Sequence, residues 1–162
     1  MASDPRADVL AAIPHRDPFL FVDRIVEQAG APEAPSLLRT EWHVPTDGDW
    51  FRGHYPGHPI LPGVLVSEFA FQSAAVLLSL RSAAQEGDVP VLIGIENARF
   101  KSTVEPGELL QAEVELLEEL SGKHYMRGVV TSAGRTVLRL RFAVAEVGEP
   151  QRQRARAGQA EA

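Results

Sequence analysis

Hydrophobic and polar residues follow two different periods along this chain. Residues 110–116 and 137–145 alternate almost strictly, as half-buried strands do. Residues 64–80 form one long apolar run in which Glu68 is the single charged residue. A helix that is apolar on nearly every side is a buried helix. We therefore predict a sheet with one apolar face and a long central helix that covers it.

The remaining pattern completes an α+β architecture. A short helix at residues 9–12 should end before Pro14, and the turns at 106–107, 121–123 and 133–135 favour antiparallel hairpins. Because such a sheet needs a partner for its apolar face, we expect a curved antiparallel sheet of about five or six strands wrapped around the central helix. The predicted strands are 21–27, 37–44, 91–100, 110–116, 125–130 and 137–145. Residues 1–147 should form a single domain, and the polar residues 148–162 a disordered tail.

A stretch rich in glycine and proline, residues 53–63, leads into the central helix. Proline presets its own φ and restricts the residue before it, so we predict a rigid, irregular loop rather than a helix or strand. A histidine held in such a loop, His54, suits a general base, although it could equally well cap a turn. His58 in the same loop is a weaker candidate. We interpret the other histidines as structural or exposed: His15, His43 and His124.

Glu68 is a carboxylate inside an otherwise apolar helix. A carboxylate removed from water holds its proton more readily, which suits a general acid. Gln72 lies on the same helical face, where it could hydrogen-bond and orient Glu68. The alternative is that this helix face reaches solvent at an edge.

Composition excludes several other classes of protein. The chain has 162 residues, no cysteine and a net charge of −6, which disfavours disulfides, thiolate chemistry and general nucleic-acid binding. Its N-terminus lacks the apolar stretch of a signal peptide, and residues 64–80 are too short and polar for a membrane span, so we expect a cytoplasmic protein. No HExxH motif or ligand cluster predicts a metal site. Ser67 and Ser73 lie in no nucleophile-elbow pattern.

Three segments carry a resemblance to a known family. Residues 53–65 with 68–72, residues 14–24, and residues 94–101 with Pro106-Gly107 are similar to FabZ-type 3-hydroxyacyl-acyl-carrier-protein dehydratases. The resemblance runs from about residue 10 to residue 146 in the family's order. It implies a hot-dog fold and a cofactor-independent enzyme that converts (3R)-hydroxyacyl thioesters to trans-2-enoyl thioesters.

The resemblance also implies a role for each matching residue. His54 would be the base that removes the α-proton, and Glu68 the acid that protonates the departing hydroxyl. The Gly63 N–H would bind the thioester carbonyl, and the Ile60 carbonyl would accept a hydrogen bond from His54. Gln72, Tyr55 and Pro62 would support this site. His54 of one subunit would meet Glu68 of the other in a homodimer, alone or within a trimer of dimers. Glu rather than Asp at position 68 favours the plain dehydratase over the related isomerising enzyme.

The implied partner is an acyl carrier protein with a phosphopantetheine-linked 3-hydroxyacyl chain. Because that partner is acidic, docking requires local cations, for which the candidates are Arg52, Arg81, Arg99 and Lys101. Phe69 and Phe71 are bulkier than is usual in the family beside the catalytic Glu and would line the acyl tunnel. The pathway would be fatty-acid or polyketide and polyene chain elongation. Two alternatives stay open: a hot-dog acyl thioesterase, and a non-catalytic subunit that binds acyl chains.

Overall fold

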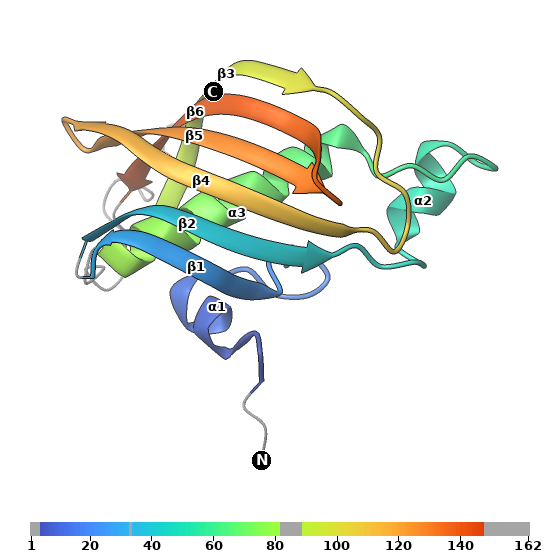
Figure 1. Ribbon diagram of the computed structural model, residues 1–162, viewed down its shortest axis with the longest axis horizontal. Helices are drawn as coiled ribbons and strands as arrows, with labels where there is room; N and C mark the ends of the chain where they lie inside the picture. Colours follow the sequence, from blue (N-terminus) through green and yellow to red (C-terminus); the bar gives the residue numbers. More distant parts are fainter. Residues whose placement is uncertain (1–3, 33, 82–88, 148–162) are drawn as a thin grey trace, which may run out of the picture.

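The computed structural model describes residues 4–32, 34–81 and 89–147. Six strands form one antiparallel sheet in the order β1-β2-β4-β5-β6-β3 (Figure 1). The predicted α+β fold with one central helix is confirmed, whereas the predicted tail at 148–162 lies outside the described residues. The strands are β1 (Arg24–Ala31), β2 (Ala34–His43), β3 (Val89–Phe100), β4 (Leu109–Leu120), β5 (Lys123–Ser132) and β6 (Arg135–Val147). The helices are α1 (Ala7–Ala12), α2 (Asp49–His54) and α3 (Gly63–Arg81).

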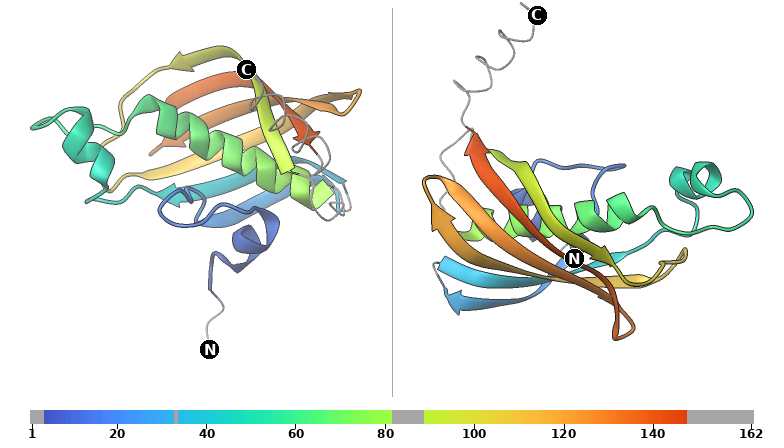
Figure 2. Two further views of the ribbon diagram at one scale, coloured as in Figure 1. Left: turned by 180° about the vertical axis from the view of Figure 1, so that it is seen from behind. Right: turned by 90° about the horizontal axis from the view of Figure 1, so that it is seen from above.

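The sheet curves around α3, which lies in its concave face (Figure 2). Phe69, Ala70, Ala74 and Leu77 of α3 are fully buried against the inward-facing side chains of the sheet. By length and composition α3 could cross a membrane, but most of it is buried inside the domain. It is therefore the core helix that the apolar pattern predicts.

Two tight turns set the register of the C-terminal strands. Ser121 and Gly122 join β4 to β5, and Ala133 and Gly134 join β5 to β6, each with positive φ. Two successive residues with positive φ make the type I′ turn, whose twist matches that of antiparallel strands. The two hairpins predicted from these positions are confirmed.

The structure corrects the prediction that residues 53–63 are irregular throughout. His54 is the last residue of helix α2, and the irregular loop begins at Tyr55. Tertiary packing explains the short helix: Phe51 is buried, and the ring of Trp50 meets Phe21 edge-on at 5.9 Å between centroids. These contacts hold one and a half turns of helix that local propensity alone does not specify.

Strand β3 forms one edge of the sheet and is unusually apolar for an edge. It pairs with β6 on one side and with no other strand of the described chain. Five of its large apolar side chains are each more than a third exposed: Val91, Leu92, Ile93, Ile95 and Phe100. An exposed, apolar edge strand is a surface suited to pairing with another chain.

Candidate active site

Helix α3 carries the predicted acid and its support on one face. Glu68 is half-buried in the second turn and Gln72 is buried one turn later. Gln72 Nε2 donates a hydrogen bond of 3.0 Å to Glu68 Oε1, as the spacing predicts. The Glu68 carboxylate is therefore held by its own helix.

The amide of Gln72 has only one orientation that satisfies its neighbours. The Phe21 N–H donates to Gln72 Oε1 at 2.8 Å, while Gln72 Nε2 donates to the Phe19 carbonyl at 3.1 Å. Because the amide oxygen already accepts from a backbone N–H, the amide NH₂ must face Glu68. Gln72 is thus a fixed donor to the carboxylate.

His54 lies at the end of α2, exposed in this chain. Its Nδ1 is 3.2 Å from the Ile60 carbonyl oxygen, and its ring lies 4.3 Å from that of Tyr55 between centroids. A carbonyl oxygen only accepts, so Nδ1 carries the hydrogen and Nε2 keeps its lone pair. The expected contact between His54 and Ile60 is present, and it leaves Nε2 free to take a proton.

A single chain does not bring His54 and Glu68 into contact. Within the described residues, the side chain of His54 contacts Ile60 and Tyr55, and that of Glu68 contacts Gln72 and His15. Helix α2 lies beyond the N-terminal end of α3, outside the curve of the sheet (Figure 2).

The first residue of α3 is the predicted donor to the thioester carbonyl. Leu65 N and Val66 N both bond to the Pro62 carbonyl, but no hydrogen bond within the described residues uses the Gly63 N–H. A Cβ at Gly63 would lie 2.9 Å from Phe100 Cε1, so any larger residue at this position would require the ring of Phe100 to move. Free N–H groups and the helix dipole favour an anion or a polarised oxygen at this position.

A small cavity of about 140 Å³ adjoins Glu68, and Phe71, Gln72, His15 and Leu92 are among its lining residues. Phe71 meets Phe142 edge-on at 4.9 Å between ring centroids. Phe69 does not line the cavity; it is fully buried with its ring 5.8 Å from that of Trp42. Of the two predicted tunnel residues, the structure places only Phe71 in the cavity beside Glu68.

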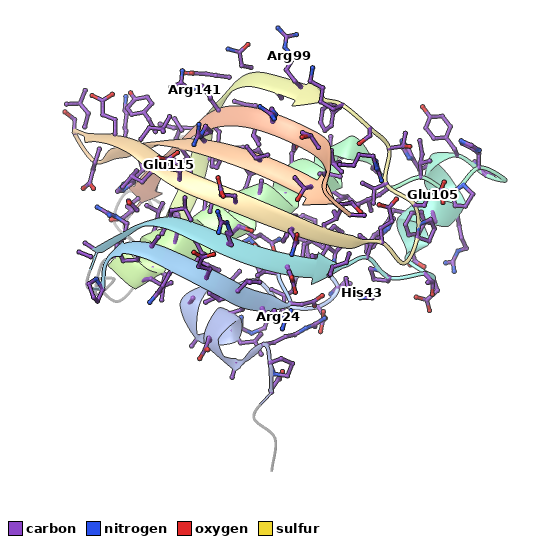
Figure 3. All side chains as sticks on the ribbon, in the orientation of Figure 1. Arg24, His43, Arg99, Glu105, Glu115 and Arg141 are labelled. Carbon is purple, nitrogen blue, oxygen red and sulfur yellow. The ribbon has the colours of Figure 1, made fainter. Side chains whose placement is uncertain are left out.

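The predicted docking cations fall into two pairs. Arg52 pairs with Asp49 at 2.6 Å, and Arg81 donates to the carbonyls of Ala34 and Pro35. Arg99 and Lys101 make no ion pair with any described residue, and together with Arg139 and Thr136 they line an open depression. Arg99 projects from β3 at the edge of the sheet (Figure 3).

One residue at this site has no role in the sequence-based interpretation. His15 Nε2 lies 3.7 Å from Glu68 Oε1, and both side chains are partly exposed. The sequence places His15 in a loop far from Glu68, and no local spacing connects the two. His15 and Glu68 become neighbours only in the tertiary structure, where this loop packs against α3.

The fold and the site define a hot-dog protein. A complex described as the dehydratase heterocomplex ApeI:P from Xenorhabdus doucetiae superimposes with a TM-score of 0.74, covering 91% of this chain and 95% of that chain at 17% identity. A hypothetical thioesterase with coenzyme A from Streptococcus pneumoniae superimposes with a TM-score of 0.55, covering 77% of this chain and 88% of that chain at 15% identity. At these identities the likeness shows the fold alone.

Sequence comparison identifies the family. A FabA-like domain matches residues 13–141. The 3-hydroxyacyl-[acyl-carrier-protein] dehydratase FabZ of Chloroflexus aggregans is 41% identical over 142 residues, which cover 86% of this chain and 94% of that protein. The FabZ of Syntrophotalea carbinolica is 38% identical over 127 residues, or 75% of this chain and 84% of that protein. The chain belongs to the FabA-like family, and its curated relatives are of the FabZ type.

Proposed function

We propose that this protein dehydrates (3R)-hydroxyacyl chains on acyl carrier protein to trans-2-enoyl chains, in fatty-acid or polyketide chain elongation. The observation that carries the proposal is that the same chain holds a histidine with a free Nε2 and a glutamate whose Oε1 is fixed by Gln72. Dehydration requires one group that accepts a proton and one that donates a proton. The FabZ relatives bear the same activity in their names.

In the proposed reaction, His54 Nε2 removes the proton from C2 of the substrate. Negative charge then develops on the thioester oxygen, which accepts a hydrogen bond from the Gly63 N–H at the positive end of α3. Glu68 gives its proton to the 3-hydroxyl as the C3–O bond breaks, and water leaves. The C2–C3 double bond forms from the electron pair left at C2. No redox step is involved.

The two groups act across a homodimer in this proposal. His54 and Glu68 do not touch within the chain, His54 is exposed, and the β3 edge presents unpaired apolar residues. A second copy paired along β3 would extend the sheet and cover these side chains. It would also bring the α2 of one subunit toward the α3 of the other.

The carrier protein would dock beside the entrance to this site. Arg99 and Lys101 have no acidic partner in the described chain, and they flank Phe100, whose ring covers Gly63. We therefore assign carrier docking to Arg99 and Lys101, with Arg139, in preference to Arg52 and Arg81, which already have partners. Such surface cations mainly set the rate of encounter.

Mass spectrometry of carrier-bound 3-hydroxyacyl chains tests the proposal. The wild-type protein should remove one water, while His54→Ala and Glu68→Gln should each slow the reaction by at least about 10³-fold. Mixing the two variants should restore about one quarter of wild-type activity, because half of the mixed dimers are heterodimers with one intact site.

The outcomes separate the alternatives. Release of free acid by the wild type would indicate a thioesterase, and unchanged chains would indicate a binding subunit. Activity in each variant alone would remove both residues from the mechanism. A mixture that stays inactive, although heterodimers are detected by native mass spectrometry, would show that the site does not cross the interface.

A further inference from the structure

The loop between α1 and β1 holds a histidine against the proposed acid. His15 Nε2 is 3.7 Å from Glu68 Oε1, and the two residues line the same cavity. This separation is within ion-pair range but longer than a hydrogen bond. The proposed reaction uses only His54 and Glu68, so His15 remains to be explained.

The position of His15 is fixed by a dense set of contacts. Arg16 Nη1 donates to the carbonyls of His15 at 2.6 Å and Ile13 at 2.8 Å, and Arg16 Nη2 donates to the Leu10 carbonyl at 3.0 Å. These bonds hold the loop onto the C-terminal end of α1. On the other side, Gln72 binds the backbone of Phe19 and Phe21. The loop is therefore tied to the same helix face that carries Glu68.

The two nitrogens of the His15 ring have different surroundings. Nδ1 is buried and has no hydrogen-bond partner among the described residues, whereas Nε2 faces the Glu68 carboxylate. A hydrogen on Nδ1 would be a buried donor without an acceptor, which is costly. The hydrogen therefore belongs on Nε2, and His15 presents a donor to Glu68.

Two donors thus converge on one oxygen of the carboxyl group. Gln72 Nε2 contacts Glu68 Oε1 at 3.0 Å, and His15 Nε2 approaches the same atom. With Oε1 surrounded by donors, an acid proton is favoured on Oε2. We propose that His15 is a positioning residue that, with Gln72, reserves Oε1 as the acceptor and leaves Oε2 to deliver the proton to the leaving hydroxyl.

This inference rests on the proposed function for its catalytic consequence. When the Oε2–H bond breaks and water leaves, Glu68 becomes a full carboxylate. The contact from His15 then shortens to a hydrogen bond, since hydrogen bonds to a charged acceptor are stronger and shorter. His15 thereby stabilises the conjugate base that forms in the transition state, which should affect kcat more than KM.

Matched amide substitutions at position 15 test the proposal. The amide nitrogen of Gln can reach the place of Nε2, whereas that of Asn lies near the place of Nδ1. His15→Gln should keep kcat within about 3-fold of wild type, while His15→Asn and His15→Leu should lower it about 10- to 100-fold. KM should change less than about 3-fold. His43→Leu, at an exposed histidine on β2, serves as the control and should leave kcat unchanged.

A second measurement does not depend on catalysis. Long-range ¹H–¹⁵N correlation spectra should show His15 as the Nε2–H tautomer in the wild type, with shifted ring nitrogens in Glu68→Gln. Equal kcat in His15→Asn and His15→Gln, or an Nδ1–H tautomer, would overturn the proposal. If the wild type dehydrates no substrate, the proposed function fails, and the tautomer still decides whether His15 donates to Glu68.

Discussion

Gln72 joins three parts of the molecule through one buried amide. It accepts from the Phe21 N–H and donates to the Phe19 carbonyl and to Glu68. The same side chain therefore fixes Glu68, the proposed acid, and fastens the loop before β1 to the central helix.

Replacing Gln72 by Leu should lower the free energy of unfolding by about 2–4 kcal/mol, because the Phe21 N–H and the Phe19 carbonyl lose their buried partner. Urea denaturation measures this change. Ser67→Ala is the control. Among the described residues, Ser67 Oγ bonds only to the Gly63 carbonyl of its own helix, and its loss should cost less than about 1 kcal/mol. Equal effects of the two substitutions would contradict the bridging role of Gln72.

Local spacing in the sequence was enough to pair some of these residues. Gln72 follows Glu68 by one helical turn, so their contact was expected from the sequence spacing. The contact between His54 and Ile60 was expected from the family resemblance. The approach of His15 to Glu68 was not expected, because it depends on where the loop after α1 returns across α3. We predicted that Phe69 lines the tunnel because it follows Glu68 in the sequence. Its position on the helix instead directs its side chain into the core.

At the scale of elements, the pattern predicted the sheet better than the short helix. Strict alternation and two Gly-containing turns gave the hairpins β4–β5 and β5–β6. Helix α2 was missed because its stability comes from the packing of Trp50 and Phe51 rather than from propensity. The order of the sheet, with β3 beside β6, also required tertiary information.

Glu108 fastens three segments at one end of the sheet. Its carboxylate accepts from Ser132 on β5, from Arg135 on β6 at 2.8 Å, and from the Glu105 N–H at 2.9 Å. Burial raises the pKa of Glu108, but the Ser132 and Glu105 hydrogen bonds and the Arg135 charge outweigh it, so the pKa lies below its ordinary value.

A depressed pKa gives Glu108 a defined effect on stability. Its stabilisation is complete above the pKa of the unfolded chain, about 4.3 for Glu, and is lost as the pH falls through the lower folded pKa. Glu108→Gln should be less stable by about 1–2 kcal/mol at pH 7, and should lose less of its remaining stability on acidification. Thermal unfolding between pH 7 and pH 3 measures this. Parallel pH curves for the two proteins would contradict the assignment.

At the scale of the whole molecule, two sheet edges differ in character. The β3 edge exposes Ile95, with 53% of its surface accessible, among neighbouring apolar residues, whereas the β1 edge exposes Val26 among polar ones. The proposed dimer uses the β3 edge alone. Ile95 on the β3 edge and Val26 on the β1 edge are both exposed β-branched residues, so substitutions at these two positions form a matched test and control.

Ile95→Glu should convert the protein to a monomer and abolish dehydration, because a charge in the paired edge would be buried without a partner. Val26→Lys should leave both the mass and the activity unchanged. Light scattering after size exclusion gives the mass of each variant. A dimeric, active Ile95→Glu protein would place the subunit interface elsewhere.

Helix α2 carries the proposed base on a projection that its own chain leaves uncovered. In the proposed dimer, each site takes its base from one subunit and its acid from the other, so a separated subunit would have no active form at infinite dilution. Turnover per subunit would then rise with protein concentration until association is complete, and become constant. In the proposed dimer, the concentration of this protein in a cell would thus set both the number of catalytic sites and the fraction of subunits that form part of a complete site.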